Sequence, residues 1–127
     1  MIESKYLLDS SAWLEYFLSG EPRMVKIINK GDCILFSSAV SLHEVKKRLL
    51  LGKEESKKIS ESLDFMKDNS IIVDVSESIL EKSADDSAKL GLSLADSVIY
   101  RTALETGAKI VTFDKDFSAR KDAIVLK

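Results

Sequence analysis

The sequence has little of what marks cross-linked or flexible proteins: one cysteine, one proline and five glycines among 127 residues. A single cysteine excludes an internal disulfide, so a small disulfide-stabilised scaffold is not expected. So few glycines and prolines leave little room for a flexible linker, and no internal repeat or low-complexity tract is visible. The length suits one ordinary domain with its own core, and we expect a single domain over residues 1–127.

Long hydrophobic runs are also missing. The run Cys33–Phe36 is typical of the chain, and it is far too short to cross a bilayer. Met1–Lys5 lacks the pattern of a signal peptide, so the cytoplasm is the expected compartment, with no membrane partner. The formal net charge is only −2, so any contact with nucleic acid has to be local rather than spread over the whole surface.

Segments with strand-like and helix-like patterns alternate along the chain. The expected strands are Lys5–Asp9, Cys33–Ser37, Ser70–Val75, Lys109–Phe113 and a short fifth at Ala123–Leu126. The expected helices are Ser10–Leu18, Glu21–Ile28, Ser41–Leu51, Lys53–Asp68, Ser76–Leu90 and Ser93–Thr106. This alternation predicts an α/β fold of three layers (α/β/α), with a central, mostly parallel sheet of four to five strands flanked by helices.

Four acidic residues fall where these elements begin or end. Asp9 ends the first strand and Asp114 follows the fourth. Glu44 and Asp96 are expected in the first turns of the helices that begin near residues 41 and 93. In a parallel sheet, the carboxyl ends of strands and the starts of the following helices share one edge, where ligands bind. The four carboxylates are therefore expected to converge.

Each of these acids, taken alone, also fits a structural role. Ser41–Glu44 and Ser93–Asp96 match the capping box, in which the acid completes the start of a helix. Asp9 and Asp114 could form turns or cap the next helix. Capping does not explain why all four fall on one predicted edge, where they repel one another unless a positive charge neutralises them.

The kind of ligand indicates the cation. His43 is the only histidine and Cys33 the only cysteine, and Cys33 lies in an apolar run that is typical of core, so a zinc site is not expected. Several carboxylates together favour Mg²⁺ or Mn²⁺. These ions keep coordination positions for water and for phosphate oxygens. The predicted chemistry is therefore hydrolysis of a phosphodiester bond by a metal-activated water.

Four segments resemble the motifs of the PIN-domain ribonucleases, and the similarity is greatest to the single-domain VapC-type toxins of toxin–antitoxin pairs. The segments are LLDSSAW (7–13), SLHEVKKRL (41–49), LSLADSVIYRTA (92–103) and IVTFDKDF (110–117). Each segment is short, but the four in this order form a specific combination. The resemblance runs from Lys5 to the C-terminus.

The resemblance implies a catalytic, metal-binding quartet around Mg²⁺ or Mn²⁺, consisting of Asp9, Glu44, Asp96 and Asp114. It adds Asp116 as an extra acid that ranks below Asp114. It places Ser11 as the small hydroxyl residue that orients the first aspartate, and Thr112 in a similar supporting position. It further implies an RNA substrate, a homodimer, and inhibition by a small antitoxin that fills a groove beside the active site.

The residues after Glu44 are basic. Lys46, Lys47 and Arg48 form either a solvated helix face or a set of contacts to RNA phosphates. Arg48 is the best candidate for such a contact because it lies one helical turn beyond Glu44. Neighbouring residues on a helix point about 100° apart, so His43 is not expected to share the direction of Glu44.

Aromatic and aliphatic residues of the first two helices have two interpretations. Trp13, Tyr16 and Phe17 have the spacing of core or dimer contacts, although an exposed Trp13 or Tyr16 could stack on a base. A groove for an antitoxin helix could be built from the apolar residues Leu14, Phe17, Leu18, Met24, Ile27 and Ile28. The sequence alone does not separate that groove from core.

Two other classes of function fit parts of the pattern. Asp114-Lys115-Asp116 after a strand resembles the D-x-D of haloacid-dehalogenase-type phosphatases, whose first aspartate is a nucleophile. Only residues 117–127 follow, too few to complete such a site. A non-catalytic Mg²⁺-binding module, such as a phosphorylatable receiver, also gathers acids at a sheet edge. A receiver needs a lysine at the end of a late strand, and Lys115, directly after Asp114, is expected to point differently.

Overall fold

The computed structural model describes residues 4–118, 120 and 123–126. Its strands are β1 (Ser4–Leu8), β2 (Cys33–Ser38), β3 (Ile71–Val73), β4 (Lys109–Thr112) and β5 (Ala123–Val125). Its helices are α1 (Ser10–Ser19), α2 (Pro22–Asn29), α3 (Ala39–Leu51), α4 (Ser56–Asn69), α5 (Glu77–Leu90), α6 (Leu94–Thr106) and the short 3₁₀-helix η1 (Lys115–Phe117). The predicted alternation of strands and helices, including the short fifth strand, is confirmed.

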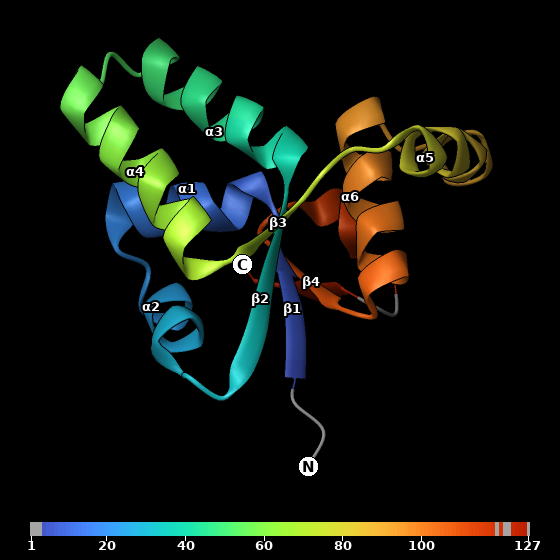
Figure 1. The fold of residues 1–127 in the computed structure, drawn as a ribbon, viewed down its shortest axis with the longest axis horizontal. Coiled ribbons are helices and arrows are strands. Elements are labelled where there is room, and N and C mark those ends of the chain that lie inside the picture. Colours follow the sequence, from blue (N-terminus) through green and yellow to red (C-terminus); the bar gives the residue numbers. More distant parts are fainter. Residues whose placement is uncertain (1–3, 119, 121–122, 127) are drawn as a thin grey trace.

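The five strands form one parallel sheet in the order β3-β2-β1-β4-β5. Helices α1 to α4 lie on one side of the sheet, and α5 and α6 lie on the other (Figure 1). The predicted α/β/α layering is therefore confirmed. No helix in the part of the chain that the structure describes is long and apolar enough to cross a membrane.

Neighbouring residues of the central strands supply the two cores. Leu8 of β1 and Val111 of β4 are fully buried against the side that carries α1 to α4. Leu7 and Ile110 are fully buried in the cluster that includes Ile99 of α6. Because successive side chains of a strand point to opposite faces, two adjacent leucines serve two different cores. This is why the strands contain continuous apolar runs rather than alternating ones.

The ends of the helices follow local side-chain chemistry. The carboxylate of Asp9 caps α1, the hydroxyl of Ser76 caps α5 and the hydroxyl of Ser93 caps α6. At the other end of α6, Gly107 has φ +71°, a left-handed conformation that glycine adopts without strain.

Helix α3 begins earlier than predicted. Its N-cap is Ser38, whose Oγ accepts a hydrogen bond from the Val40 N–H at 3.2 Å, and β2 passes directly into the helix without a loop. The expected capping box at Ser41–Glu44 is therefore wrong, and Ser41 is fully buried. Glu44 lies in the second turn of α3 rather than the first.

Of the aromatic residues of α1, Trp13 belongs to the core, and Tyr16 and Phe17 are half-buried against it. Trp13 is fully buried, and its indole N–H donates to the Ser37 hydroxyl at 2.9 Å. Its ring packs against Tyr16, Phe17 and Phe65. A base-stacking role for Trp13 is thereby excluded.

Candidate functional site

The order of the strands indicates where a ligand crevice lies on this sheet. The chain winds outward from β1 through β2 to β3 and then returns to the other side of β1 with β4. In open parallel sheets, ligands bind at the carboxyl ends of the two strands between which the winding reverses. Asp9 directly follows β1, and Asp114 lies two residues after β4. Both residues are therefore at the reversal point.

Asp9 is only 5% exposed, and its carboxylate accepts three hydrogen bonds. Its Oδ1 accepts from the Ser11 hydroxyl at 2.7 Å and from the Ala12 N–H at 3.0 Å. Its Oδ2 accepts from the hydroxyl of Thr112. The same carboxylate thus caps α1 and faces the end of β4, so its capping role and a ligand role do not exclude each other.

The hydroxyls of Ser11 and Thr112 also hold the segment that follows β4. The Phe113 N–H donates to the Ser11 Oγ at 2.9 Å, and the Asp114 N–H donates to the Thr112 Oγ1 at 2.9 Å. Each hydroxyl therefore connects Asp9 to the main chain next to Asp114. The two supporting residues of the sequence prediction lie where they can orient both aspartates.

Asp96, Asp114 and Asp116 form a compact group of acids. One carboxylate oxygen from each lies within 4.8 Å of the others. Asp96 is in the first turn of α6, and its N–H donates to the Ser93 Oγ at 3.2 Å, so the expected cap at Ser93 is correct. Asp114 caps η1 by accepting from the Asp116 N–H at 2.9 Å. Two distant segments of the chain thus bring three negative charges together.

The proximity of these acids affects their ionisation. Burial, together with the nearby carboxylate of Asp114, raises the pKa of Asp96 to about 6. The carboxylates of Asp116 and Asp9 raise this pKa further, whereas the hydrogen bond with Ser93 lowers it. Burial also raises the pKa of Asp9, while its hydrogen bonds from Thr112, Ser11 and Ala12 oppose the change. The ionised site is electrostatically unfavourable, and a bound cation would reverse this.

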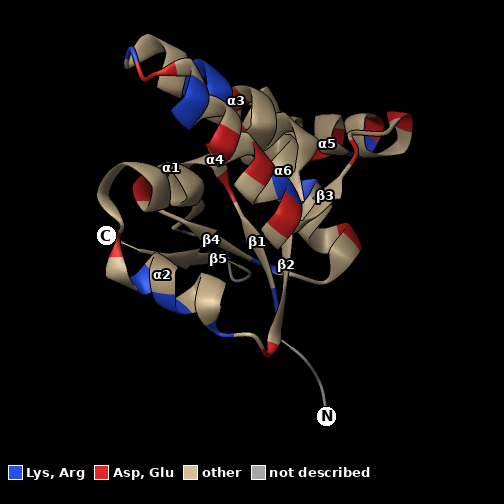
Figure 2. Ribbon diagram, turned by 60° about the vertical axis from the view of Figure 1, so that its left-hand side comes forward, with Lys and Arg blue, Asp and Glu red and all other residues tan. Residues whose placement is uncertain are grey.

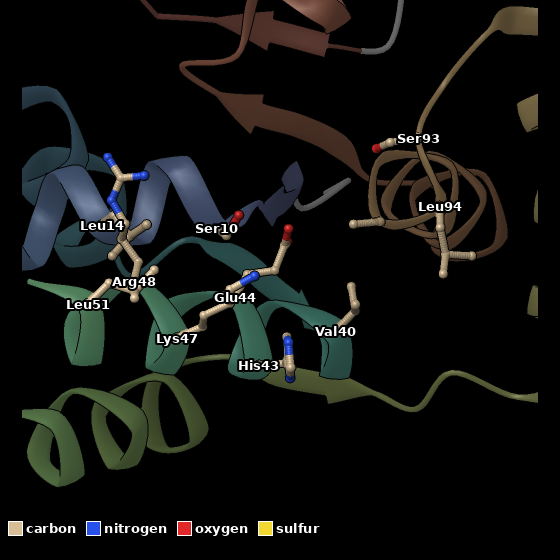
Figure 3. Close-up of a pocket in the computed structure, with 11 residues that line it drawn as sticks. Ser10, Leu14, Val40, His43, Glu44, Lys47, Arg48, Leu51, Ser93 and Leu94 are labelled. Carbon is tan, nitrogen blue, oxygen red and sulfur yellow. The ribbon is translucent and has the colours of Figure 1, made fainter.

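Glu44 lies apart from the compact acid group. Among the residues that the structure describes, the mutually close acid oxygens belong to Asp96, Asp114 and Asp116, without Asp9 or Glu44. Glu44 lines a groove of about 620 Å³, with its carboxylate pointing into the space between Ser10 and Ser93 (Figure 3). His43 lines the same groove, but Figure 3 shows its side chain leaving α3 in a different direction from that of Glu44, as the helical geometry predicts.

The groove continues between α1 and α3. Arg48 lines three adjoining hollows there, which are also lined by Leu14, Leu18 and Leu51. Leu51 is 71% exposed. Lys47 lines the same groove as Glu44, and Lys46 borders a neighbouring apolar hollow next to Leu50. Of the basic candidates, Arg48 is the one that lines all three of these hollows.

The sequence analysis missed several residues of this groove, namely Ser10, Val40, Leu51, Ser93, Leu94 and Ala95. Leu51 could have been found, because it lies seven positions after Glu44 and therefore on the same side of α3. Conversely, Met24 is fully buried and is core rather than groove. Phe17, Ile27 and Ile28 pack against the same core.

The acid group fits a hard divalent cation. Mg²⁺ binds oxygen at about 2.1 Å, so two ligands on opposite sides of one ion are about 4.2 Å apart. The three carboxylate oxygens, within 4.8 Å of one another, are close to that arrangement. Cys33 begins β2, at the amino end of the sheet and away from this edge. The donors near the edge are oxygens, which suit Mg²⁺ or Mn²⁺ better than zinc.

Comparison with known proteins agrees with this fold. The PIN domain family model matches residues 6–123. A toxin–antitoxin complex from Klebsiella pneumoniae superposes with a TM-score of 0.79 at 18% identity, covering 94% of this chain and 96% of that chain. VapBC2 from Rickettsia felis, bound to a promoter DNA fragment, gives a TM-score of 0.75 at 16% identity, with 96% and 97% covered. VapC20 from Mycobacterium tuberculosis, a Sarcin-Ricin loop cleaving toxin, gives 0.73 at 16%, with 91% and 95% covered.

No protein of curated function matches the sequence. The sequence identities to the solved structures are low, so those structures establish the fold alone. Membership of a family is established by the family model. The family model spans almost the whole chain, including the four acids Asp9, Glu44, Asp96 and Asp114. The chain therefore belongs to the PIN-domain family, and its fold is that of the VapC toxins of VapBC toxin–antitoxin systems.

Proposed function

We propose that this protein is an endoribonuclease that hydrolyses RNA with the help of Mg²⁺ or Mn²⁺, and that it is the toxin of a toxin–antitoxin pair. One observation carries the proposal. In a chain of the PIN-domain family, acids from separate segments lie together at the carboxyl ends of β1 and β4, where the winding of the sheet reverses. A carboxylate such as Asp96, whose pKa is raised by burial and by neighbouring carboxylates, is an expected ligand of a hard cation.

The residues of the site divide into two groups by position. Asp96 and Asp114, with Asp9 beside them, would hold the cation, and Asp116 would assist through its contact with Asp114. When bound there, a divalent ion would supply a Lewis acid that lowers the pKa of a bound water and offsets negative charge on the leaving oxygen. Glu44 approaches from the groove, where its carboxylate can accept a hydrogen bond from water or from the substrate.

The site itself is acidic, so attraction of RNA has to come from its surroundings. Lys46, Lys47 and Arg48 are exposed on α3, beyond Glu44. Figure 2 shows basic segments gathered on α3, with others on α2. Contacts from such residues to phosphates supply affinity without reading the sequence. We assign α3 as the side along which RNA approaches.

The groove between α1 and α3 fits the antitoxin. An amphipathic helix binds by placing its apolar side into a hydrophobic groove. Leu14, Leu18 and Leu51 provide the apolar lining, and Arg48 provides a partner for an acidic side chain. Solved structures of the same fold include VapBC complexes from Rickettsia felis and Salmonella typhimurium, which supports a small protein partner. A homodimer, which the family resemblance implies, and a cytoplasmic location remain predictions.

The two alternative functions have less support. A receiver-like sheet of the flavodoxin type has the strand order 2-1-3-4-5, whereas the order here is β3-β2-β1-β4-β5. A phosphatase with an aspartate nucleophile would need further groups beyond the D-x-D segment. The PIN family match over residues 6–123 accounts for that segment without such groups.

The proposal is tested with purified protein and a mixed pool of single-stranded RNA. Cleavage is expected with Mg²⁺ or Mn²⁺ and not with EDTA, and Asp96→Asn should abolish it. Asp85→Asn is the matched control, because Asp85 is an exposed aspartate of α5 outside the site. RNA that stays intact with either metal, or an Asp96→Asn variant as active as the parent, contradicts the proposal.

A further inference from the structure

A chain of contacts runs from the start of α2 to the segment that carries Asp114. The guanidinium carbon of Arg23 lies 5.5 Å from the centre of the Phe113 ring. The Arg23 Nε–H donates to the Glu21 Oε1 at 2.7 Å. Phe113 is the residue directly before Asp114. The contact therefore joins α2, near the beginning of the sequence, to the candidate metal site near its end.

Arg23 lies in the first turn of α2, which is held by local contacts. Glu21 caps α2, because its Oε2 accepts from the N–H groups of Arg23 at 2.8 Å and of Met24 at 3.3 Å. Pro22 restricts the first turn, and Met24 anchors it in the core, where it is fully buried. The same carboxylate thus fixes both the main chain and the side chain of Arg23.

The Phe113 side chain and the Asp114 carboxylate contact different layers of the fold. The main chain bends at Phe113, between the end of β4 and the start of η1. Phe113 packs against the core that holds α1 and α2. The carboxylate of Asp114 lies beside Asp96 of α6. A brace on Phe113 therefore resists movement of Asp114 away from its partners.

The contact between Arg23 and Phe113 opposes a destabilising force, because the acids of the site repel one another. Asp96, Asp114 and Asp116 lie within reach of a single ion, and their repulsion acts on the short η1 segment when no cation is bound. The hydrogen bonds from Ser11 and Thr112 hold the main chain from the side of Asp9. Arg23 and Phe113 hold it from the side of α2.

We infer that Arg23 and Phe113 are positioning residues that keep the Asp114 segment in its metal-binding geometry. Their value for metal binding rests on the proposed function, but their effect on the segment itself does not. A cation–π contact at a partly exposed site corresponds to about a two- to five-fold effect on a local equilibrium.

The experiment measures hydrogen exchange at the amides of Phe113, Asp114 and Asp116 by NMR in metal-free protein. Arg23→Gln and Phe113→Leu should each speed exchange at these amides about two- to five-fold. The amide of Val111 in the core should be unchanged. The double variant should exchange no faster than the faster single variant, because the two residues act through one contact. Arg23→Lys, which keeps the cation, should restore part of the protection.

Lys26→Gln is the matched control, since Lys26 is an exposed cation one turn along α2. Equal exchange in Arg23→Gln and the parent, or equal acceleration in Lys26→Gln, overturns the inference whether or not the protein cleaves RNA. A calorimetric titration with Mn²⁺ gives the second readout, with affinity about two- to five-fold weaker in Arg23→Gln. If the parent binds no Mn²⁺ the proposed function fails, while the exchange rates still decide the inference.

Discussion

Asp9 accepts a hydrogen bond from the hydroxyl of Thr112, a residue 103 positions away in the chain. This contact joins the exit of β1 to the exit of β4, the two neighbouring strands between which the winding of the sheet reverses. The Thr112 hydroxyl in turn accepts from the Asp114 N–H. The geometry of the candidate site therefore depends on the correct pairing of β1 with β4.

Substitution of Asp9 should separate stability from activity. Asp9→Asn keeps an oxygen that can cap α1, so the fold should persist while RNA cleavage falls on the order of 100-fold or more. Asp9→Ala also removes the cap, which is expected to cost about 1 kcal/mol of unfolding free energy. Urea denaturation and a cleavage assay on both variants make the comparison. An Asp9→Asn variant that cleaves RNA like the parent would show that Asp9 is only a helix cap.

Loss of the Thr112 hydroxyl should lower the cleavage activity strongly, although the change in side-chain size is small. Thr112→Val leaves an oxygen of Asp9 and the N–H of Asp114 without this partner, so we expect activity to fall about 10- to 100-fold. Thr112→Ser retains the hydroxyl and should keep most of the activity. Steady-state cleavage rates at a fixed Mn²⁺ concentration test this pair. Equal rates for the two variants would mean that the hydroxyl does not orient the site.

The metal-free protein should lose stability as the pH rises. The pKa of Asp96 is raised from 3.8 to about 6, so folding favours its protonated form. The folded state is therefore destabilised progressively as the pH rises from about 4 to above 6, where Asp96 is ionised in both states. Asp96→Asn should remove this part of the pH dependence. Urea denaturation in EDTA at pH 4 to 8 measures it, with Asp85→Asn as the control, and parallel curves for Asp96→Asn and the parent would contradict the prediction.

Metal binding should raise the melting temperature through the compact acid group. A ligand at 100 times its dissociation constant adds about 2.7 kcal/mol of unfolding free energy. Mn²⁺ should therefore raise the melting temperature of the parent and have little effect on Asp114→Asn. Glu44→Gln should keep most of the shift, because Glu44 lies outside that group, yet it should lose cleavage. Loss of the whole shift in Glu44→Gln would place Glu44 among the principal ligands.

The basic residues of α3 should govern the salt dependence of RNA binding. In an inactive Asp9→Asn background, Lys47→Gln should weaken binding to all RNA sequences alike and reduce the slope of log affinity against log salt by about 0.7. Lys57→Gln on α4 is the control for an exposed lysine outside the groove. Fluorescence anisotropy at several salt concentrations measures the slopes. Identical slopes for Lys47→Gln and Lys57→Gln would remove α3 from the RNA path.

Much of the fold could be predicted because helix and strand periodicity, glycine stops and capping residues act over a few neighbouring positions. Leu7 and Leu8, or Ile110 and Val111, already indicate a strand buried on both faces. Topology rules then predict that the acids lie at one edge of the sheet, since the carboxyl ends of parallel strands lie together. For the same reason Asp9, Asp96 and Asp114 could be grouped from the sequence alone.

Only the tertiary structure decided how the side chains of different elements meet. It moved the cap of α3 from Ser41 to Ser38, separated Glu44 from the compact acids and assigned Leu51 to a groove and Met24 to the core. It also placed Arg23 on Phe113. Residue spacing determines which side of its own helix a side chain occupies, whereas its distance to another element depends on how the helices pack across the sheet.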